Sequence, residues 1–180
     1  MKKSEIRKKI FKLRKKIYLK SKYLDTNKII NFLNKKKIKN KIVGGYYPYN
    51  YEIDVLDILN NLEKKNYRIS LPKIEKNNKM NFYRWSFDEP LLINDYGIPE
   101  PISKKKVYPE ILLIPLMGFD NEFNRLGYGG GFYDRYLAKK GNSRKILKIG
   151  VGFSLQKVSK IPTNQHDVSL DNIITEKKIY

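Results

Sequence analysis

Short apolar runs alternate along this chain with segments whose apolar residues repeat at helical spacing. The apolar runs occupy residues 42–47, 67–71, 111–115, 146–153 and 172–175, and the helical segments occupy residues 6–17, 26–33, 55–62 and 132–140. Strands that alternate with helices of this length favour a parallel sheet with helices on both faces. We therefore expect an α/β fold: a single three-layer α/β/α domain over residues 1–180, built on a mostly parallel, Rossmann-like open sheet.

Local signals refine several of these elements. Ile6, Ile10, Leu13 and Ile17 step by four, three and four residues, which predicts one buried stripe on a basic helix. A second helix is expected to start at Asp25 or Thr26, because either side chain can cap it. Residues 80–85 alternate as an exposed or edge strand does. The prolines in residues 97–101 block both a helix and a strand ladder, which predicts a rigid loop.

Composition excludes several classes of protein. The chain has no cysteine, so disulfides, thiol catalysis and Cys-ligated zinc are excluded, and His166 is the only histidine. No Gly-x-Ser-x-Gly elbow supports a Ser-His-Asp hydrolase. The longest uncharged apolar stretch, residues 111–119, is too short to span a bilayer. Charges at residues 5–9 interrupt the apolar run that a signal peptide needs, so we expect a cytoplasmic protein without a membrane partner.

Positive charge is concentrated near the N-terminus. The formal net charge is +20, and residues 1–41 contain 17 Lys or Arg against only Glu5 and Asp25. Such a segment attracts phosphate-rich partners, from nucleic acid to small polyphosphates. Lysine greatly outnumbers arginine throughout the chain, however, which favours solvated helix faces over a surface that recognises nucleic acid.

The most informative segment is a glycine-rich stretch between a predicted buried strand and a predicted helix, the place where open α/β sheets bind ligands. Its glycines let backbone amides approach an anion, and the next helix turns its positive end to the same place. Arg125 and Arg135 flank it, and guanidinium suits phosphate. Asp134 supplies a hard oxygen ligand of the kind that Mg²⁺ prefers. These features predict a magnesium–nucleotide site.

Two common phosphate-binding motifs do not fit this segment. A Walker A loop requires Lys and then Ser or Thr after its last glycine, but Phe132 and Tyr133 follow Gly131. The dinucleotide fingerprint requires a glycine three residues after Gly129, where Phe132 stands. The remaining alternative is a turn that only connects a strand to a helix, and the flanking arginines and Asp134 count against it.

The run Arg-Leu-Gly-Tyr-Gly-Gly-Gly-Phe-Tyr-Asp-Arg at residues 125–135 resembles the signature of the 5-formyltetrahydrofolate cyclo-ligase (methenyltetrahydrofolate synthetase) family. Further ordered segments resemble the same family: the opening helix at residues 3–7, the Glu52-Ile53-Asp54 segment, the loop at 97–101, the strand and Phe-Asp turn at 111–120, and the close at 166–176. These matches extend over nearly the whole chain.

The resemblance implies an ATP-dependent, ADP-forming ligase that closes 5-formyltetrahydrofolate to 5,10-methenyltetrahydrofolate and releases ADP and phosphate. It implies attack of the formyl oxygen on the γ-phosphate, an iminium phosphate intermediate, addition of N10 and loss of phosphate. Such chemistry depends on positioning and charge neutralisation more than on a protein nucleophile. The expected partners are ATP, Mg²⁺ and the folate, which can be polyglutamylated, and we expect a monomer.

The resemblance also assigns roles to residues. The expected ATP-binding residues are Lys3, Arg7, Arg125, Leu126, Gly127, Tyr128, Gly129, Gly130, Gly131, Phe132 and Tyr133, with Arg125 and Lys3 catalytic. The expected folate-binding residues are Glu52, Trp85, Tyr128, Gly129, Gly130, Gly131 and Phe132, and the expected Mg²⁺ ligands are Asp134 and Asp167. The family commonly has tyrosine in place of Phe132, so Phe132 is expected to contribute only its backbone.

Two alternatives belong to other functional classes. A nucleic-acid-binding module would use the basic residues 1–41, but it would leave the glycine-rich segment unexplained. Another enzyme for phosphate-bearing ligands, such as a sugar-phosphate isomerase or a CoA transferase, could use a similar α/β scaffold. Activity without ATP would distinguish the second alternative from the ligase.

Overall fold

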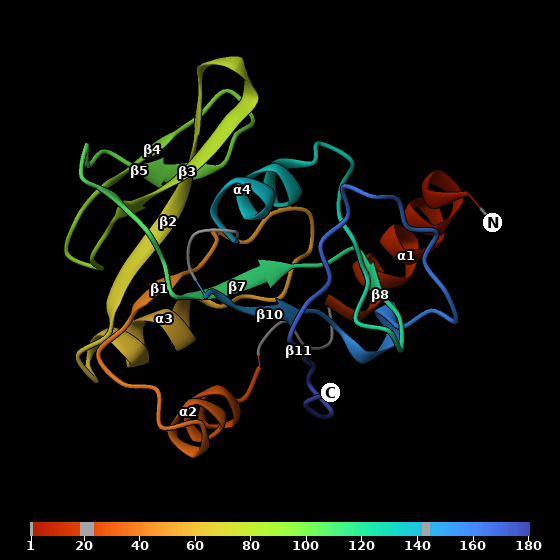
Figure 1. The fold of residues 1–180 in the computed structure, drawn as a ribbon, viewed down its shortest axis with the longest axis horizontal. Helices are drawn as coiled ribbons and strands as arrows, with labels where there is room; N and C mark the ends of the chain where they lie inside the picture. Colours follow the sequence, from red (N-terminus) through yellow and green to blue (C-terminus); the bar gives the residue numbers. More distant parts are fainter. Residues whose placement is uncertain (1, 19–23, 142–144) are drawn as a thin grey trace.

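A seven-stranded sheet runs through the middle of the protein in a computed structural model that describes residues 2–18, 24–141 and 145–180 (Figure 1). In spatial order its strands are β11 (Asn172–Ile174), β10 (Leu147–Val151), β7 (Ile111–Pro115), β1 (Ile42–Gly44), β2 (Arg68–Glu75), β3 (Lys79–Arg84) and β6 (Lys106–Val107). The first five strands are parallel, and β3 and β6 are antiparallel additions. The predicted α/β fold with a mostly parallel sheet is confirmed.

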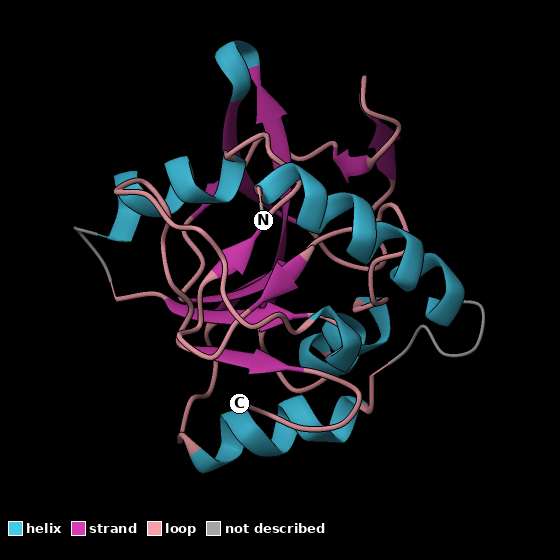
Figure 2. Cartoon of the chain, turned by 90° about the vertical axis from the view of Figure 1, so that its right-hand side faces the viewer, coloured by secondary structure: helices cyan, strands magenta, loops and turns pink. Residues whose placement is uncertain are grey.

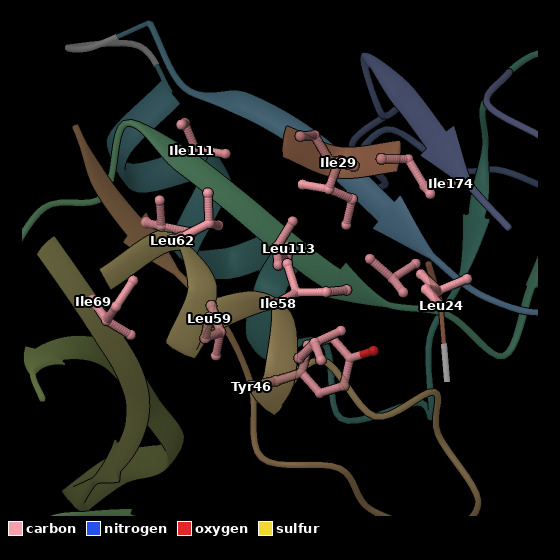
Figure 3. Packing of buried hydrophobic residues seen from close by; sticks show 14 of the residues in the cluster. Leu24, Ile29, Tyr46, Ile58, Leu59, Leu62, Ile69, Ile111, Leu113 and Ile174 are labelled. Carbon is pink, nitrogen blue, oxygen red and sulfur yellow. The ribbon is translucent and has the colours of Figure 1, made fainter. Parts of the chain in front are cut away.

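Helices cover both faces of the sheet. Helices α2 (Thr26–Lys35) and α3 (Leu56–Glu63) pack on one face, and α4 (Phe132–Gly141) packs on the other. In β7, Ile111 and Leu113 join the core under α2 and α3, and Leu112 and Ile114 join the core under α4. Figure 3 shows the β7 side chains packed against α3. A strand buried on both faces is apolar at consecutive positions in the sequence, which is why β7 was predictable as a central strand.

The first helix, α1 (Lys3–Tyr18), lies across the carboxyl end of the parallel strands (Figure 1), and Figure 2 looks onto this end. Ile6 and Ile10 pack there, beside Met117. The predicted stripe is wrong at one position: Leu13 is 39% exposed, while Arg14 is 0% exposed. The helix meets a surface that offers backbone oxygens at this point, so a guanidinium occupies the inward position.

The second helix starts where its cap was expected. Asp25 accepts a hydrogen bond from the backbone N–H of Asn27 at 2.9 Å, so Asp25 is the N-cap and α2 begins at Thr26. In the described ranges of the chain, no helix is both long and apolar enough to cross a membrane.

Two short hairpins and two 3₁₀ turns complete the fold. Strand β4 (Leu91–Ile93) pairs with β5 (Pro99–Pro101), and β8 (Gly118–Phe119) pairs with β9 (Arg125–Leu126). The 3₁₀ turns are η1 (Lys76–Asn78) and η2 (Ser154–Gln156).

Two loop and edge predictions were wrong. The segment with two prolines is strand β5, because residues two apart point their backbone N–H positions to the same side, and both prolines can face away from β4. Strand β3 is not the edge of its sheet, since β6 pairs with Phe82 and Tyr83 on its outer side.

Candidate active site

A cavity of about 790 Å³ lies at the carboxyl ends of β1 and β7. Its walls come from α1, the segment after β1, the β2–β3 hairpin, the β4–β5 hairpin, the glycine-rich segment, α4, and residues 164–167. This volume falls within the range of ligand pockets, and the position is where open α/β sheets place their ligands.

Two arginines clamp the glycine-rich segment. The Nε of Arg7 donates to the carbonyl oxygen of Gly127 at 2.7 Å, and Nη1 of Arg135 donates to that of Gly130 at 2.8 Å. The backbone of Gly131 has a φ of +64°, and a Cβ there would lie 2.8 Å from Arg135 Nη1. A side chain at this position would be strained by the backbone conformation, and it would displace the end of the Arg135 side chain from the loop. The result is a fixed backbone loop that leads into the amino end of α4.

Two ion pairs place charge beside this loop. Arg125 Nη2 lies 2.8 Å from Asp134 Oδ1, with the arginine side chain only 5% exposed. Lys3 Nζ lies 2.6 Å from Asp167 Oδ2. The site thus holds cations for an anionic ligand, each one already balanced by a carboxylate.

The Asp134 carboxylate lies beside the segment that carries Asp167. The backbone N–H of Val168, next to Asp167, points to Asp134 Oδ1 at 3.5 Å. Burial opposes ionisation of Asp167, but hydrogen bonds from Lys3 and the backbone of Asn164 lower its pKa below the ordinary value. Within the described residues no third Asp, Glu or His joins them in a metal-binding cluster. Mg²⁺ usually takes one or two carboxylates together with phosphate oxygens and water, so this donor set fits it.

The other end of the cavity is aromatic and encloses one carboxylate. Glu52 is buried, and its Oε2 accepts a hydrogen bond from the backbone N–H of Tyr49 at 2.9 Å. Burial raises the pKa of Glu52 to about 7, although the Tyr49 hydrogen bond and the charge of Arg14 both act to lower it. Burial also raises the pKa of Tyr128 and Tyr133. Glu52 therefore titrates near neutral pH among phenols that stay protonated.

Comparison with known proteins shows the family to which the chain belongs. A profile of the 5-formyltetrahydrofolate cyclo-ligase family matches residues 1–176. The chain belongs to that family.

Individual members are similar over most of their length. A 5-formyltetrahydrofolate cyclo-ligase of Haemophilus influenzae is 33% identical over 156 residues, which cover 83% of this chain and 82% of the relative. The structure of a 5,10-methenyltetrahydrofolate synthetase from Aquifex aeolicus superposes with a TM-score of 0.77 at 30% identity, covering 99% of this chain and 92% of the other. For the synthetase from Mycoplasma pneumoniae the TM-score is 0.73 at 26% identity, covering 98% and 99%.

The cyclo-ligase resemblance drawn from the sequence named site residues in segments far apart in the chain. The cavity brings together Lys3, Arg7, Glu52, the whole run from Arg125 to Asp134, and Asp167. Trp85 is not brought to it. That indole is 5% exposed in the core, where it packs on Phe87 at 4.5 Å between ring centroids and donates to the Glu89 carbonyl oxygen at 3.0 Å.

Other cavity residues were missing from the sequence-based set of cyclo-ligase site residues. Tyr46, Tyr49, Tyr96 and Arg135 all line the cavity. Arg135 carried a signal, because it follows the glycines, but the tyrosines did not, since the chain has 14 of them. Only the folded arrangement shows which of these tyrosines face the ligand space.

Proposed function

We propose that this chain catalyses the ATP- and Mg²⁺-dependent closure of 5-formyltetrahydrofolate to 5,10-methenyltetrahydrofolate, with release of ADP and phosphate. The supporting observation is one cavity in which a cation-flanked glycine loop meets an aromatic end that holds Glu52. Family membership and the names of the relatives agree with this reaction.

In this proposal the ATP phosphates lie along the backbone of residues 126–133. Lys3, Arg7 and Arg125 neutralise their charge, and the amino end of α4 contributes its exposed N–H groups. The Lys3–Asp167 and Arg125–Asp134 pairs support this assignment, because they keep the cations at the cavity wall before ATP arrives.

Asp134 and Asp167 are the proposed Mg²⁺ ligands. When bound, the ion would offset phosphate charge and orient the γ-phosphoryl group. The N–H of Val168 keeps the Asp134 carboxylate beside the segment that carries Asp167. Loading of the ion would compete with the ion pairs of both carboxylates, so Lys3 and Arg125 would be released to contact phosphate.

The folate ring is proposed to occupy the aromatic end. The Glu52 carboxylate would accept hydrogen bonds from N–H donors of the pterin ring, and the backbone of residues 128–132 would face the formyl group. The proposed reaction needs no sulfur or histidine nucleophile. The tyrosines of this end would instead serve to exclude water from the reacting groups.

The proposed reaction has two stages. The formyl oxygen attacks the γ-phosphorus, the bond to ADP breaks, and the folate becomes an iminium phosphate. N10 then adds to the activated carbon, loses its proton, and the carbon–oxygen bond breaks to release phosphate. Arg125 and Lys3 would stabilise the negative charge that spreads over the transferred group, a contribution worth on the order of 2–4 kcal/mol for a single preorganised donor.

The test follows the near-ultraviolet absorbance of methenyltetrahydrofolate after the protein is mixed with 5-formyltetrahydrofolate, ATP and Mg²⁺ at neutral pH. Parallel reactions omit ATP or Mg²⁺. An increase that requires both supports the proposal. No increase from protein that circular dichroism shows to be folded would overturn it, and an increase without ATP would indicate another reaction on this scaffold.

A further inference from the structure

Arg14 is a fully buried arginine that does not line the cavity. It lies on the inward face of α1, two helical turns beyond Arg7. Within the described ranges no carboxylate lies in ion-pair distance of it, and its Nε is buried without a hydrogen-bond partner there. A buried cation that lacks a paired carboxylate is expensive to maintain, so the three contacts that it does make require an explanation.

Those contacts join three separate segments. Nη1 donates to the carbonyl oxygen of Leu116 at 3.2 Å, and Nη2 donates both to the carbonyl oxygen of Asn50 and to the hydroxyl of Tyr128. The guanidinium also lies 5.3 Å from the centre of the Tyr128 ring. Leu116 follows the central strand β7, Asn50 precedes Glu52, and Tyr128 belongs to the glycine-rich segment. One side chain outside the cavity therefore connects both ends of its wall.

The connection reaches Glu52 through two further hydrogen bonds. The Tyr128 hydroxyl donates to the carbonyl oxygen of Tyr49 at 3.3 Å, and the N–H of Tyr49 donates to Glu52 Oε2 at 2.9 Å. The same peptide segment thus contacts the glycine-rich segment on one side and Glu52 on the other. Displacement of Tyr128 would loosen the backbone that holds Glu52.

The turn before Glu52 has a backbone that needs such support. Asn50 and Tyr51 have φ values of +48° and +63°, a conformation that costs energy for residues with side chains. Helix α1 supplies the support: the Tyr51 ring packs edge-on against Phe11 and Tyr18, at 5.7 and 5.6 Å, while Arg14 binds the Asn50 carbonyl.

We propose that Arg14 is a positioning residue, which fixes Tyr128 and the turn at residues 49–52 as one wall and supplies positive charge that favours the anionic form of Glu52 for the folate ring. The inference rests on the proposed function for its ligand, although the role of Arg14 toward Glu52 can be measured without any ligand. In this proposal Arg14, on the inner face of α1, supports the folate end of the site, whereas Lys3 and Arg7 contact the phosphates at the other end.

The ligand-free test is a carboxyl ¹³C NMR titration of Glu52, with its signal assigned by its loss in Glu52→Gln. The charged and titratable groups acting on Glu52 are Arg14 and the phenols of Tyr46, Tyr128 and Tyr133. Arg14→Met should move the Glu52 midpoint to higher pH by about one unit, because a neighbouring positive charge is lost. Arg14→Lys keeps the charge and should leave the midpoint near that of the wild type. Lys12→Met, on the exposed face of α1, is the matched control.

The second measurement is calorimetric binding of 5-formyltetrahydrofolate and of ATP. Arg14→Met should raise the Kd for the folate about tenfold or more and raise the Kd for ATP by a smaller factor, since Tyr128 also belongs to the segment proposed to hold the phosphates. Arg14→Lys should give an intermediate folate Kd, since lysine cannot bind two acceptors in the same planar geometry. A wild-type Glu52 midpoint together with a wild-type folate Kd in folded Arg14→Met would overturn the proposal.

Failure of the proposed function gives a different result. If the wild-type protein does not bind the folate, the cyclo-ligase assignment falls, while the Glu52 titration still decides the role of Arg14. If the Arg14 variants do not fold, Tyr128→Phe replaces them, because it removes the hydroxyl that accepts from Arg14, donates to the Tyr49 carbonyl and interacts with the Glu52 carboxylate. This variant should weaken folate binding several-fold or raise the Glu52 midpoint, and wild-type values in both measurements would overturn the proposal.

Discussion

At the scale of single residues, two cations of the site are paired with carboxylates before a ligand binds. Lys3 holds Asp167 at 2.6 Å and Arg125 holds Asp134 at 2.8 Å. Each pair keeps a buried or half-buried charge from being isolated, which is the condition under which such groups are tolerated. In the proposed reaction, a polyphosphate and its metal ion would replace both partners of each pair at once, so binding would exchange ion pairs without leaving a charge unpaired.

Glu52 makes no ion pair within the described residues, and burial raises its pKa to about 7. Between the ordinary pKa of glutamate and about 7 the folded state binds more protons than the unfolded state, so the protein loses stability as pH rises through that window. Glu52→Gln removes this loss. The variant should gain up to about 3 kcal/mol over the wild type at slightly alkaline pH and much less at acidic pH.

Urea denaturation at the two pH values measures this difference. Glu122→Gln, which also removes one negative charge but at an exposed position, is the control. A stability difference for Glu52→Gln that stays constant across the range would contradict the raised pKa.

Asp134 has a structural role in addition to its proposed metal role. Asp134→Asn leaves the Arg125 guanidinium, whose Nε already lacks a partner among the described residues, without its ionic partner. We expect a loss of about 2 kcal/mol in the free energy of unfolding, below the range for fully buried pairs because the Asp134 side chain is 21% exposed. The Mg²⁺ concentration for half-maximal turnover should also rise strongly.

The matched control is Asp171→Asn, which breaks the more exposed pair with Lys148 away from the cavity. Denaturation and Mg²⁺ titration are measured on both variants. Equal effects of the two substitutions on the Mg²⁺ requirement would remove Asp134 from the metal site.

At the scale of elements, the β4–β5 hairpin forms part of the cavity wall. Its turn depends on Asn94, whose Oδ1 accepts hydrogen bonds from the N–H groups of Tyr96 and Ile98 at 2.9 and 3.1 Å, and whose Nδ2 donates to Glu100 at 3.1 Å. Tyr96 and Ile98 line the cavity, so this turn shapes the opening.

Asn94→Ala should therefore loosen the turn while the sheet stays folded. We expect chymotrypsin to cleave after Tyr96 several times faster than in the wild type, and the KM for the folate to rise, because local opening exposes the chain to protease. Limited proteolysis with mass spectrometry measures the first effect. Asn61→Ala on the exposed face of α3 is the control, and equal cleavage rates in the two variants would show that Asn94 does not hold the turn.

Elements were predictable from sequence where one physical requirement dominated. Strand β7 is apolar at every position because helices cover both sheet faces, and α2 starts after a cap that Asp25 supplies on its own. Predictions failed where the requirement came from a distant segment. Arg14 is buried and Leu13 is exposed, because Leu116, Asn50 and Tyr128 offer oxygens to the inner face of α1. The spacing of apolar residues within α1 cannot predict acceptors from other segments.

The candidate site followed the same rule. The glycines, Arg125 and Asp134 could be named because their order indicates a phosphate-binding loop between a strand and a helix. The other residues of the run, and the distant Lys3, Arg7, Glu52 and Asp167, were named only through the family resemblance. Trp85 could not be placed, since it follows the end of β3 and the sequence does not say whether a side chain there meets the ligand or the core. The aromatic end of the cavity, with Tyr49 and Tyr96, arises from the meeting of three segments and had no local signal.

At the scale of the whole molecule, the excess of positive charge should act on the rate of ligand capture. With a formal net charge of +20, the association rate constant for ATP should fall about tenfold from low to high salt, while the dissociation rate constant changes much less. Stopped-flow fluorescence with a labelled ATP measures both. A neutral adenosine analogue is the control, and equal salt dependence of the two ligands would contradict electrostatic steering.

The basic residues of α1 also allow a test of the alternative function, nucleic-acid binding. A nucleic-acid-binding role predicts tight RNA binding that weakens steeply with salt and is lost when Lys8, Lys9, Lys12 and Lys16 of α1 are changed to glutamine. We expect the wild-type protein to bind RNA only weakly. The glutamine variant should keep its folate turnover, because these lysines lie on the exposed face of α1, away from the cavity.

The Lys3–Asp167 contact joins residues 164 positions apart, and it bears on how the protein is made. Helix α1 leaves the ribosome long before the segment that carries Asp167, so the part of α1 that contacts this segment stays uncovered until then. Long-range closure of this kind slows folding and leaves partly built chains open to wrong contacts. The proposed phosphate site and strand β11 are therefore among the last parts to form during translation, and a product truncated before Asp167 would lack both the Lys3–Asp167 pair and the last strand of the sheet.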